Sequence, residues 1–171
     1  MSSEIIQTKY KQMLPTKLKA KPRSASEHEE QSKLILIVRN YLAPKYPCLK
    51  WLHSVPNGLA LHPAIASTMI KEGQKNGIPD LCLPFKSGSY SQLYIEMKSA
   101  KGVLSSQQTD FKAYAQTQGY KMVVCKTTIA ALESLFLYCA LSFSFMADCK
   151  PYLELSYKEL FELDKSEEIH L

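Results

Sequence analysis

Apolar residues recur at helical spacing in four parts of the chain. The first pattern runs from Ser26 to Pro44, and Ser26 with Glu29 three residues later has the form of a capping box. Three further helices are expected at residues 62–72, 105–118 and 127–141, each with a proline, serine or threonine near its start. Gly73 and Gly119 follow two of these segments, as is typical where a helix ends.

Shorter apolar runs of β type lie between the helical segments. Strands are expected at residues 48–55, 81–85, 92–97 and 120–125. Pro56-Asn57-Gly58 is a turn signal after the first strand, and the Gly/Ser loop at 86–90 predicts that the second and third strands form an antiparallel hairpin. This order of elements predicts an α/β fold, in which helices flank both faces of a central mixed β-sheet.

Charge divides the chain into three parts. Residues 1–25 carry six basic residues against Glu4, a net charge of +5, and are interpreted as a basic flexible N-terminal arm. Such an arm suits contact with a phosphate backbone, although a solvated leader has the same composition. Residues 26–141 form the expected folded domain. Residues 142–171 are interpreted as an acidic C-terminal extension without a clear place in the core, apart from a short helix around Tyr157–Leu163.

Composition narrows the class of protein. The 171 residues, of which 46% are apolar, suit a single globular domain with a real core. The five cysteines form no C-x-x-C pair, which argues against structural disulfides and zinc and for a reducing compartment. No apolar run reaches membrane length, and the N-terminus lacks the core of a signal peptide. We therefore expect an intracellular protein without a membrane anchor.

The candidate chemistry lies between residues 80 and 98. Pro79-Asp80 precedes one predicted strand, and Glu96-Met97-Lys98 ends the next. Carboxylates at the ends of adjacent strands can share a divalent cation, and Lys98 lies on the same face of its strand as Glu96. Two solvent-facing acids and an ordinary lysine are the simpler reading of the same residues.

Several motifs occur in a shared order around these residues. They are Glu27-His28-Glu29-Glu30-Gln31, Pro56-Asn57-Gly58, Lys71-x-Gly73-x-Lys75-x-Gly77-Ile78-Pro79-Asp80, Ile95-Glu96-Met97-Lys98, Gly102-x-Leu104-Ser105-x-x-Gln108 and Gly119-Tyr120. With these motifs the chain resembles the VRR-NUC (virus-type replication-repair nuclease) domain, a branch of the PD-(D/E)xK restriction-endonuclease-like superfamily. The resemblance covers residues 27–138.

The resemblance implies a restriction-endonuclease-like fold and metal-dependent hydrolysis of DNA phosphodiesters, with Mg2+ or Mn2+ as cofactor and no small-molecule cofactor. Stand-alone members of this size resemble the phage and bacterial type, which implies a homodimer that cuts branched DNA such as four-way (Holliday) junctions. The expected location is the cytoplasm or nucleoid, or the host cytoplasm if the protein is phage-encoded. The apolar residues 135–138 and 141–146 are a candidate dimer interface.

The resemblance also implies roles for particular residues. The implied metal ligands are Asp80, Glu96 and the backbone carbonyl of Met97, and Lys98 assists the attack of water. The first helix supplies a further catalytic acid, for which Glu27 is preferred over Glu30. Gln108 supports the site. The expected DNA-binding residues are Asn57, Gly58, Lys71, Lys75, Gly77 and Lys101.

Other readings stay open. The chain could be a flap nuclease or nickase of the same fold, which only the preferred DNA structure would distinguish. It could be a catalytically inactive DNA-binding module, although the intact Asp80, Glu96 and Lys98 argue against this. It could also be an interaction protein of a phage or mobile element. The three tyrosines Tyr94, Tyr114 and Tyr120 are expected in the core rather than in a base-stacking platform.

Overall fold

The computed structural model describes residues 26–56, 63–142 and 144–168. Its centre is a four-stranded sheet in the order β1-β2-β3-β4. Strands β1 (His53–Ser54), β2 (Leu81–Leu83) and β3 (Leu93–Met97) are antiparallel neighbours, whereas β4 (Lys121–Cys125) runs parallel to β3. The predicted hairpin and the predicted mixed sheet are therefore confirmed.

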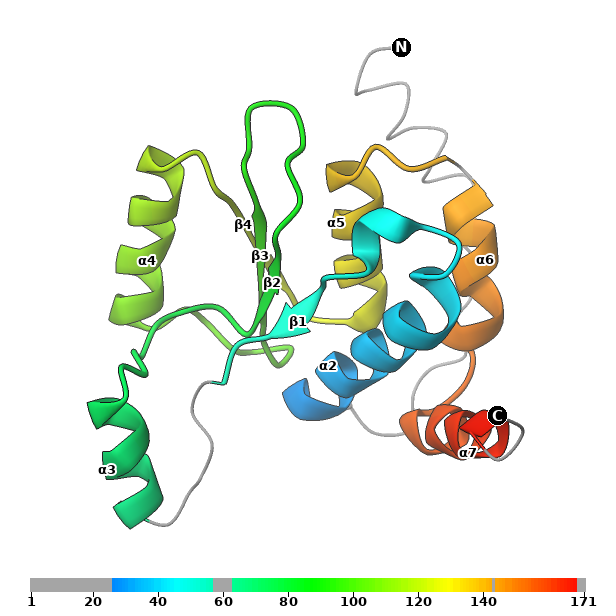
Figure 1. Cartoon of the computed structure of the whole chain (residues 1–171), viewed down its shortest axis with the longest axis horizontal. Coiled ribbons are helices and arrows are strands. Elements are labelled where there is room, and N and C mark those ends of the chain that lie inside the picture. Colours follow the sequence, from blue (N-terminus) through cyan, green and yellow to red (C-terminus); the bar gives the residue numbers. More distant parts are fainter. Residues whose placement is uncertain (1–25, 57–62, 143, 169–171) are drawn as a thin grey trace.

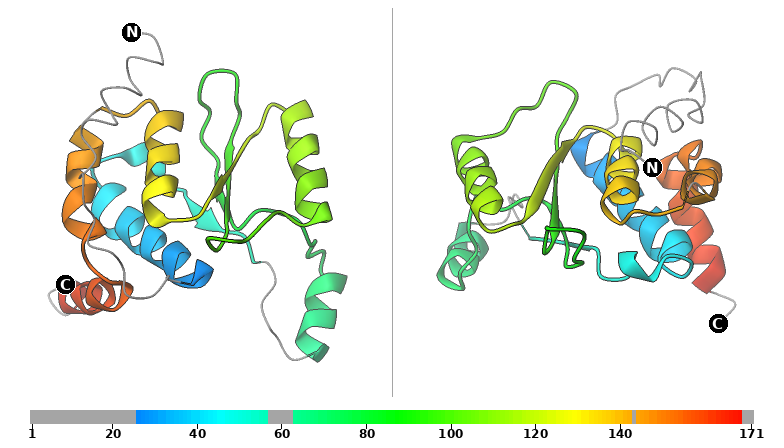
Figure 2. Two further views of the ribbon diagram at one scale, coloured as in Figure 1. Left: turned by 180° about the vertical axis from the view of Figure 1, so that it is seen from behind. Right: turned by 90° about the horizontal axis from the view of Figure 1, so that it is seen from above.

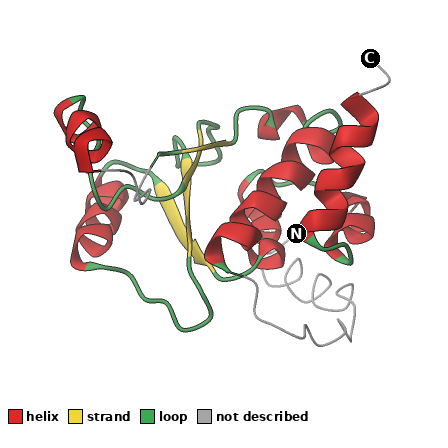
Figure 3. Ribbon diagram, turned by 90° about the horizontal axis from the view of Figure 1, so that it is seen from below, coloured by secondary structure: helices red, strands yellow, loops and turns green. Residues whose placement is uncertain are grey.

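Helices cover both faces of the sheet, as expected (Figures 1 and 3). Helices α2 (Glu27–Leu36), α5 (Thr128–Tyr138), α6 (Ser144–Leu153) and α7 (Tyr157–Glu168) lie on one side. Helices α3 (Pro63–Lys71) and α4 (Ser106–Thr117) lie on the other side, and two further views agree on this division (Figure 2). Among the described residues, no helix is both long and apolar enough to cross a membrane.

The first helix begins where its capping box predicts. The Ser26 hydroxyl accepts a hydrogen bond from the Glu29 N–H, and the Glu29 carboxylate accepts one from the Ser26 N–H at 2.7 Å. The helix then changes to a π-helical segment, η1 (Ile37–Leu42), before Pro44. The apolar faces of both segments are buried in the main core, which includes Leu34, Ile37 and Leu42.

The strand predicted at residues 48–55 is mostly wrong. Pro47–Leu49 is a short 3-10 helix, η2, and only His53–Ser54 pairs with β2. Pro47 at the start of η2 favours a helical turn there, and the ladder with β2 begins only at His53. The Val55 N–H still bonds to the Asp80 carbonyl at 2.8 Å, so this segment reaches the start of β2.

The C-terminal residues belong to the core, contrary to expectation. Phe145, Cys149 and Leu160 are fully buried in the main core, on the side of the sheet that carries α2 and α5. Helix α6 also continues through Pro151, and α7 is longer than the short segment expected there. The apolar character of residues 142–160 therefore serves the fold of the protomer itself.

This packing also argues against the dimer interface expected at residues 135–138 and 141–146. Leu135, Phe136, Tyr138, Phe145 and Met146 are all buried within the protomer. Because these side chains fill the core, they are not available to a second copy of the chain. The proposed interface at 135–138 and 141–146 is therefore wrong for most of its described side chains.

An aromatic cluster joins α4 to the sheet. The Tyr94 ring lies 5.0 Å from the Phe111 ring and 5.9 Å from the Tyr120 ring, and Tyr114 packs against both Phe111 and Tyr120. Tyr114 is 52% exposed, so its expected place in the core is wrong. Ala115 is the α4 residue that is fully buried, and the rings at the edge of the cluster meet solvent.

Candidate active site

The register of the hairpin sets the two central carboxylates opposite each other. Leu81 pairs with Ile95 in the antiparallel ladder, so the preceding Asp80 lies across from Glu96. The Asp80 carboxylate accepts a hydrogen bond from the Met97 N–H at 2.8 Å, which fixes its position. The sheet thus brings together the two acids that the sequence placed 16 residues apart.

Glu96 is the most confined acid of this group. Its side chain is fully buried, and its Oε1 atom lies 2.6 Å from the Lys98 Nζ and accepts a hydrogen bond from the Gln108 Nε2 at 2.5 Å. The second oxygen, Oε2, is buried and has no hydrogen-bond partner within the described part of the chain. A buried carboxylate oxygen without a partner is costly, and a cation would remove that cost.

The pKa values of Asp80 and Glu96 are both raised above their ordinary values. Burial raises the pKa of Glu96, and the nearby Asp80 and Glu27 carboxylates raise it further, although Lys98 opposes the shift. Burial also raises the pKa of Asp80, with Glu27 adding to the effect and the Met97 N–H opposing it. Negative charge is therefore concentrated and incompletely solvated at this end of the sheet.

Lys98 completes the ion pair at the site. Burial alone would lower its pKa, but the hydrogen bond and charge of Glu96, with the charges of Glu27 and Asp80, raise the pKa above its ordinary value. Its side chain is 13% exposed, so the ammonium group is largely held within the site. Met97 is fully buried between Glu96 and Lys98, as the alternation along the strand predicts.

Gln108 has its amide group oriented by the start of α4. Its Oε1 atom accepts the Ser105 N–H at 2.9 Å within a capping box, which leaves the Nε2 atom to donate to Glu96. The same side chain therefore caps a helix and supports the carboxylate.

The two acids of the first helix have different surroundings. The Glu27 Oε2 atom accepts the Ser99 N–H at 3.2 Å, just after Lys98, and the Glu27 charge acts on Asp80, Glu96 and Lys98. The Glu30 carboxylate instead accepts hydrogen bonds from the N–H and hydroxyl of Thr128, both at 2.7 Å. The geometry places Glu27 at the site and Glu30 at the start of α5.

Lys33 continues this polar row along α2 and was not among the expected residues. It is 6% exposed, and its Nζ donates to the Leu153 carbonyl at 2.8 Å and to the Leu155 carbonyl. These carbonyls lie at the end of α6, where a cation is favourable. The available sequence signal was the spacing of three between the polar residues at 27, 30 and 33, which places them on one side of the helix.

Four of the six expected DNA-binding residues belong to the described part of the chain, and they lie in three different segments. Lys71 and Lys75 are exposed beside the end of α3, and Lys101 is exposed in the loop after Lys98. Gly77 has a φ of +89°, and a Cβ there would meet the Gln107 backbone at 2.8 Å, so glycine is required by packing at that position. Asn57 and Gly58 lie outside the described residues, as does the basic arm at 1–25.

The acids of the candidate site offer only a partial set of ligands for a cation. Within residues 26–56, 63–142 and 144–168, no closed group of three or more His, Cys, Asp or Glu side chains could hold a metal ion. Asp80 and Glu96 nevertheless offer oxygen donors, which suit hard divalent cations, and the unpartnered Glu96 Oε2 fits such a role. The candidate site thus has two carboxylates, Asp80 and Glu96, and Glu27 contacts the Ser99 N–H next to Lys98.

Comparisons with known proteins identify the family and the fold of the chain. The family model described as "VRR-NUC domain" matches residues 20–128, more than half of the chain. A solved structure titled "VRR_NUC domain protein" has the same fold, with a TM-score of 0.58 at 22% sequence identity, over 70% of this chain and 93% of that chain. A search of curated proteins found no significant match. The chain therefore belongs to the VRR-NUC family of nuclease domains.

Proposed function

We propose that this protein is a metal-dependent, structure-selective DNA endonuclease that resolves four-way junctions as a homodimer. The observation that carries the proposal is Glu96, a fully buried carboxylate with one oxygen held by Lys98 and Gln108 and the other without a partner in the described structure. This arrangement suits a site prepared for a cation and an incoming phosphate.

Asp80, Glu96 and the Met97 backbone carbonyl would hold Mg2+ or Mn2+. When bound, such an ion supplies Lewis-acid stabilisation of negative charge on the phosphate. The Asp80 carboxylate is fixed in position by the hydrogen bond from the Met97 N–H. Gln108 fixes the orientation of the Glu96 carboxylate. Glu27, anchored at the Ser99 N–H, is the first-helix acid in this proposal.

Lys98 provides the positive charge nearest to the proposed reaction. Its Nζ donates to the Glu96 Oε1 and can donate its remaining protons to an attacking water or to a phosphate oxygen. Charge neutralisation of this kind stabilises the pentacovalent transition state of phosphodiester hydrolysis. The site geometry fixes Lys98 beside Glu96, so its ammonium group needs little reorganisation.

The homodimer follows from the shape of the proposed substrate. A four-way junction has two-fold symmetry, and paired incisions on it need two sites related by the same symmetry. The interface would use surfaces other than the buried side chains of residues 135–138 and 145–146. A purified protein that sediments as a monomer under cleavage conditions would contradict this part of the proposal.

The proposal is tested by cleavage of labelled four-way junction, flap and linear duplex by wild type and Asp80→Ala, with Mg2+, Mn2+ or EDTA. We expect cutting that needs metal and that falls about 100- to 1,000-fold in the variant, because a charged group at the reacting centre is lost. Asp110→Ala is the matched control, since Asp110 is an exposed acid on α4. Equal cutting by wild type and Asp80→Ala would overturn the assignment of the site.

The preferred substrate decides between related activities. Selective cutting of the four-way junction supports the resolvase, and selective cutting of flaps supports a flap nuclease. Binding of DNA by wild type without cleavage under any metal condition would replace the enzyme by an inactive DNA-binding module.

A further inference from the structure

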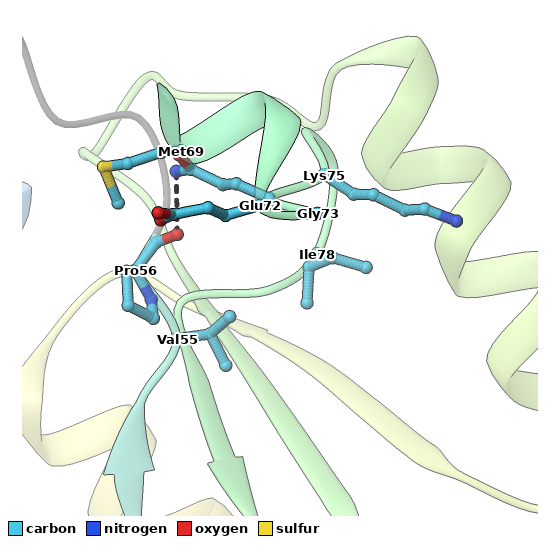
Figure 4. Close-up of a pocket in the computed structure, with 8 residues that line it drawn as sticks. Val55, Pro56, Met69, Glu72, Gly73, Lys75 and Ile78 are labelled. Carbon is cyan, nitrogen blue, oxygen red and sulfur yellow. Dashed lines mark hydrogen bonds between the residues drawn. The ribbon is translucent and has the colours of Figure 1, made fainter. Parts of the chain in front are cut away.

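A pocket of about 410 Å3 adjoins the chain segment that leads to Asp80, and Figure 4 shows residues that line it. It is formed by the segment after β1, the last turn of α3 and the loop that leads to Asp80. The lining residues are Val55, Pro56, Met69, Glu72, Gly73, Gln74, Lys75 and Ile78. A volume of this size is within the range of pockets that take small organic ligands.

The pocket is joined directly to the site by the backbone. The Val55 N–H donates to the Asp80 carbonyl at 2.8 Å, and Ile78 is followed by the buried Pro79 and then Asp80. The Gln74 side chain donates to the Pro56 carbonyl at 2.9 Å and ties the loop to the segment after β1. The wall of the pocket and the catalytic carboxylate are therefore parts of one connected segment.

The lining combines apolar surfaces with polar groups. Val55, Pro56, Met69 and Ile78 provide the apolar surface, and none of the described lining residues is aromatic. Figure 4 shows the Lys75 side chain pointing away from the Glu72 carboxylate, so its positive charge lies on the other side of the loop. An uncharged ligand with an apolar face and polar edge groups fits this lining, because Glu72 and Gln74 are the polar residues beside the apolar surface.

We propose that this pocket receives an unpaired nucleobase of the DNA, close to the phosphodiester that is cut. The inference rests on the proposed function, because it places the substrate across Asp80 and Glu96. A base can enter only where it is not stacked in a regular duplex, and the unstacking cost is lowest at branch points and unpaired ends. Because the pocket can take a base only where that base is unstacked, it contributes to selection of branched DNA.

The test uses junction and flap DNA in which a single 2-aminopurine is moved through the positions near the branch. Binding is measured in EDTA, with excitation at wavelengths where tryptophan does not absorb. At one position we expect several-fold brighter 2-aminopurine fluorescence with wild type, because the base leaves the stack for a pocket whose described lining has no aromatic ring. Met69→Trp fills the pocket and removes this signal.

Ile70→Trp is the matched control. Ile70 adjoins Met69 on α3, is 63% exposed and does not line the pocket, so this variant keeps the signal. An abasic nucleotide at the responding position tests the same contact without any change in the protein. It should weaken binding by wild type about 5- to 150-fold and have little effect with Met69→Trp.

The outcomes separate this inference from the proposed function. If no position responds, or if Met69→Trp and Ile70→Trp behave alike while wild type cuts DNA with Mg2+, the pocket inference is wrong and the nuclease proposal stands. If one position responds through Met69 but no DNA is cut, the nuclease proposal falls and the base pocket stands. If Met69→Trp is unfolded by circular dichroism, the abasic comparison with wild type decides.

Discussion

Asp80 illustrates how a functional site conflicts with stability at the scale of one residue. Burial and the Glu27 carboxylate both raise its pKa, which means that its negative charge is disfavoured in the folded protein. Its hydrogen bond from Met97 needs only an oxygen acceptor, which an asparagine also has. The charge is therefore required for the proposed cation and not for the fold.

From this we predict that Asp80→Asn raises the melting temperature at neutral pH in EDTA. An acid whose folded-state pKa is raised destabilises the protein when it is ionised. The difference between variant and wild type should shrink as the pH falls through the raised pKa of Asp80, and it should vanish below the pKa of the unfolded chain. Thermal unfolding from pH 7 to pH 3 measures this, and a lower melting temperature for the variant at pH 7 would contradict it.

At the scale of elements, α2 joins the active site to the helical layer. Glu27 reaches the loop after β3, Glu30 binds the first turn of α5, and Lys33 binds the end of α6. These residues are three positions apart, so they form a row along one face of the helix. The position of Glu27 therefore depends on how α2 is held by the other two contacts.

We predict that Glu30→Ala lowers the free energy of unfolding by about 1–3 kcal/mol. The change leaves the N–H and hydroxyl of Thr128, which is 2% exposed, without the carboxylate that they now bind. Urea unfolding provides the measurement. His28→Ala is the control, because His28 is exposed on the same helix and its replacement should change stability by less than about 0.5 kcal/mol. Equal stability of the two variants would show that the Thr128 contact contributes little.

At the scale of the whole molecule, the C-terminal helices complete the core. Phe145 and Cys149 of α6 and Leu160 of α7 are fully buried, and the Asp148 carboxylate on α6 binds both Lys45 and the Tyr46 hydroxyl. The Tyr46 ring also meets the Phe145 ring edge-on, with centroids 5.0 Å apart. The unit that folds thus extends beyond residue 141.

Truncation after residue 141 should therefore prevent cooperative folding. Complete burial of a large apolar side chain contributes about 1.5–3 kcal/mol, and a typical domain has only about 5–15 kcal/mol of net stability. Circular dichroism and thermal unfolding of 26–141 and of 26–171 would test this. Phe145→Ala in the full chain is a smaller change, and we expect it to lower the free energy of unfolding by about 3–5 kcal/mol. A truncated chain that unfolds cooperatively at the same temperature would show that α6 and α7 are dispensable.

Most helices and the antiparallel hairpin could be predicted from the sequence because their signals are local. Ser26, Ser105 and Thr127 cap α2, α4 and α5 as expected, and α3 begins at Pro63. The strand at 48–55 failed because β-type composition does not determine whether a backbone finds a partner. Pairing requires a neighbouring strand, and only His53–Ser54 has one in β2.

The sequence by itself determined the family motifs, the capped helices and the pairing of Asp80 with Glu96, since all of these depend on residues close in the chain or in one hairpin. The sequence preferred Glu27 over Glu30 through the family resemblance, but only tertiary structure gave Glu30 its partner, because Thr128 is 98 residues away in the chain. Tertiary structure also decided that the C-terminal helices belong to the core and that one oxygen of Glu96 is left without a described partner. Burial and long-range hydrogen bonding depend on which segments meet in space, and no local pattern of residues specifies that.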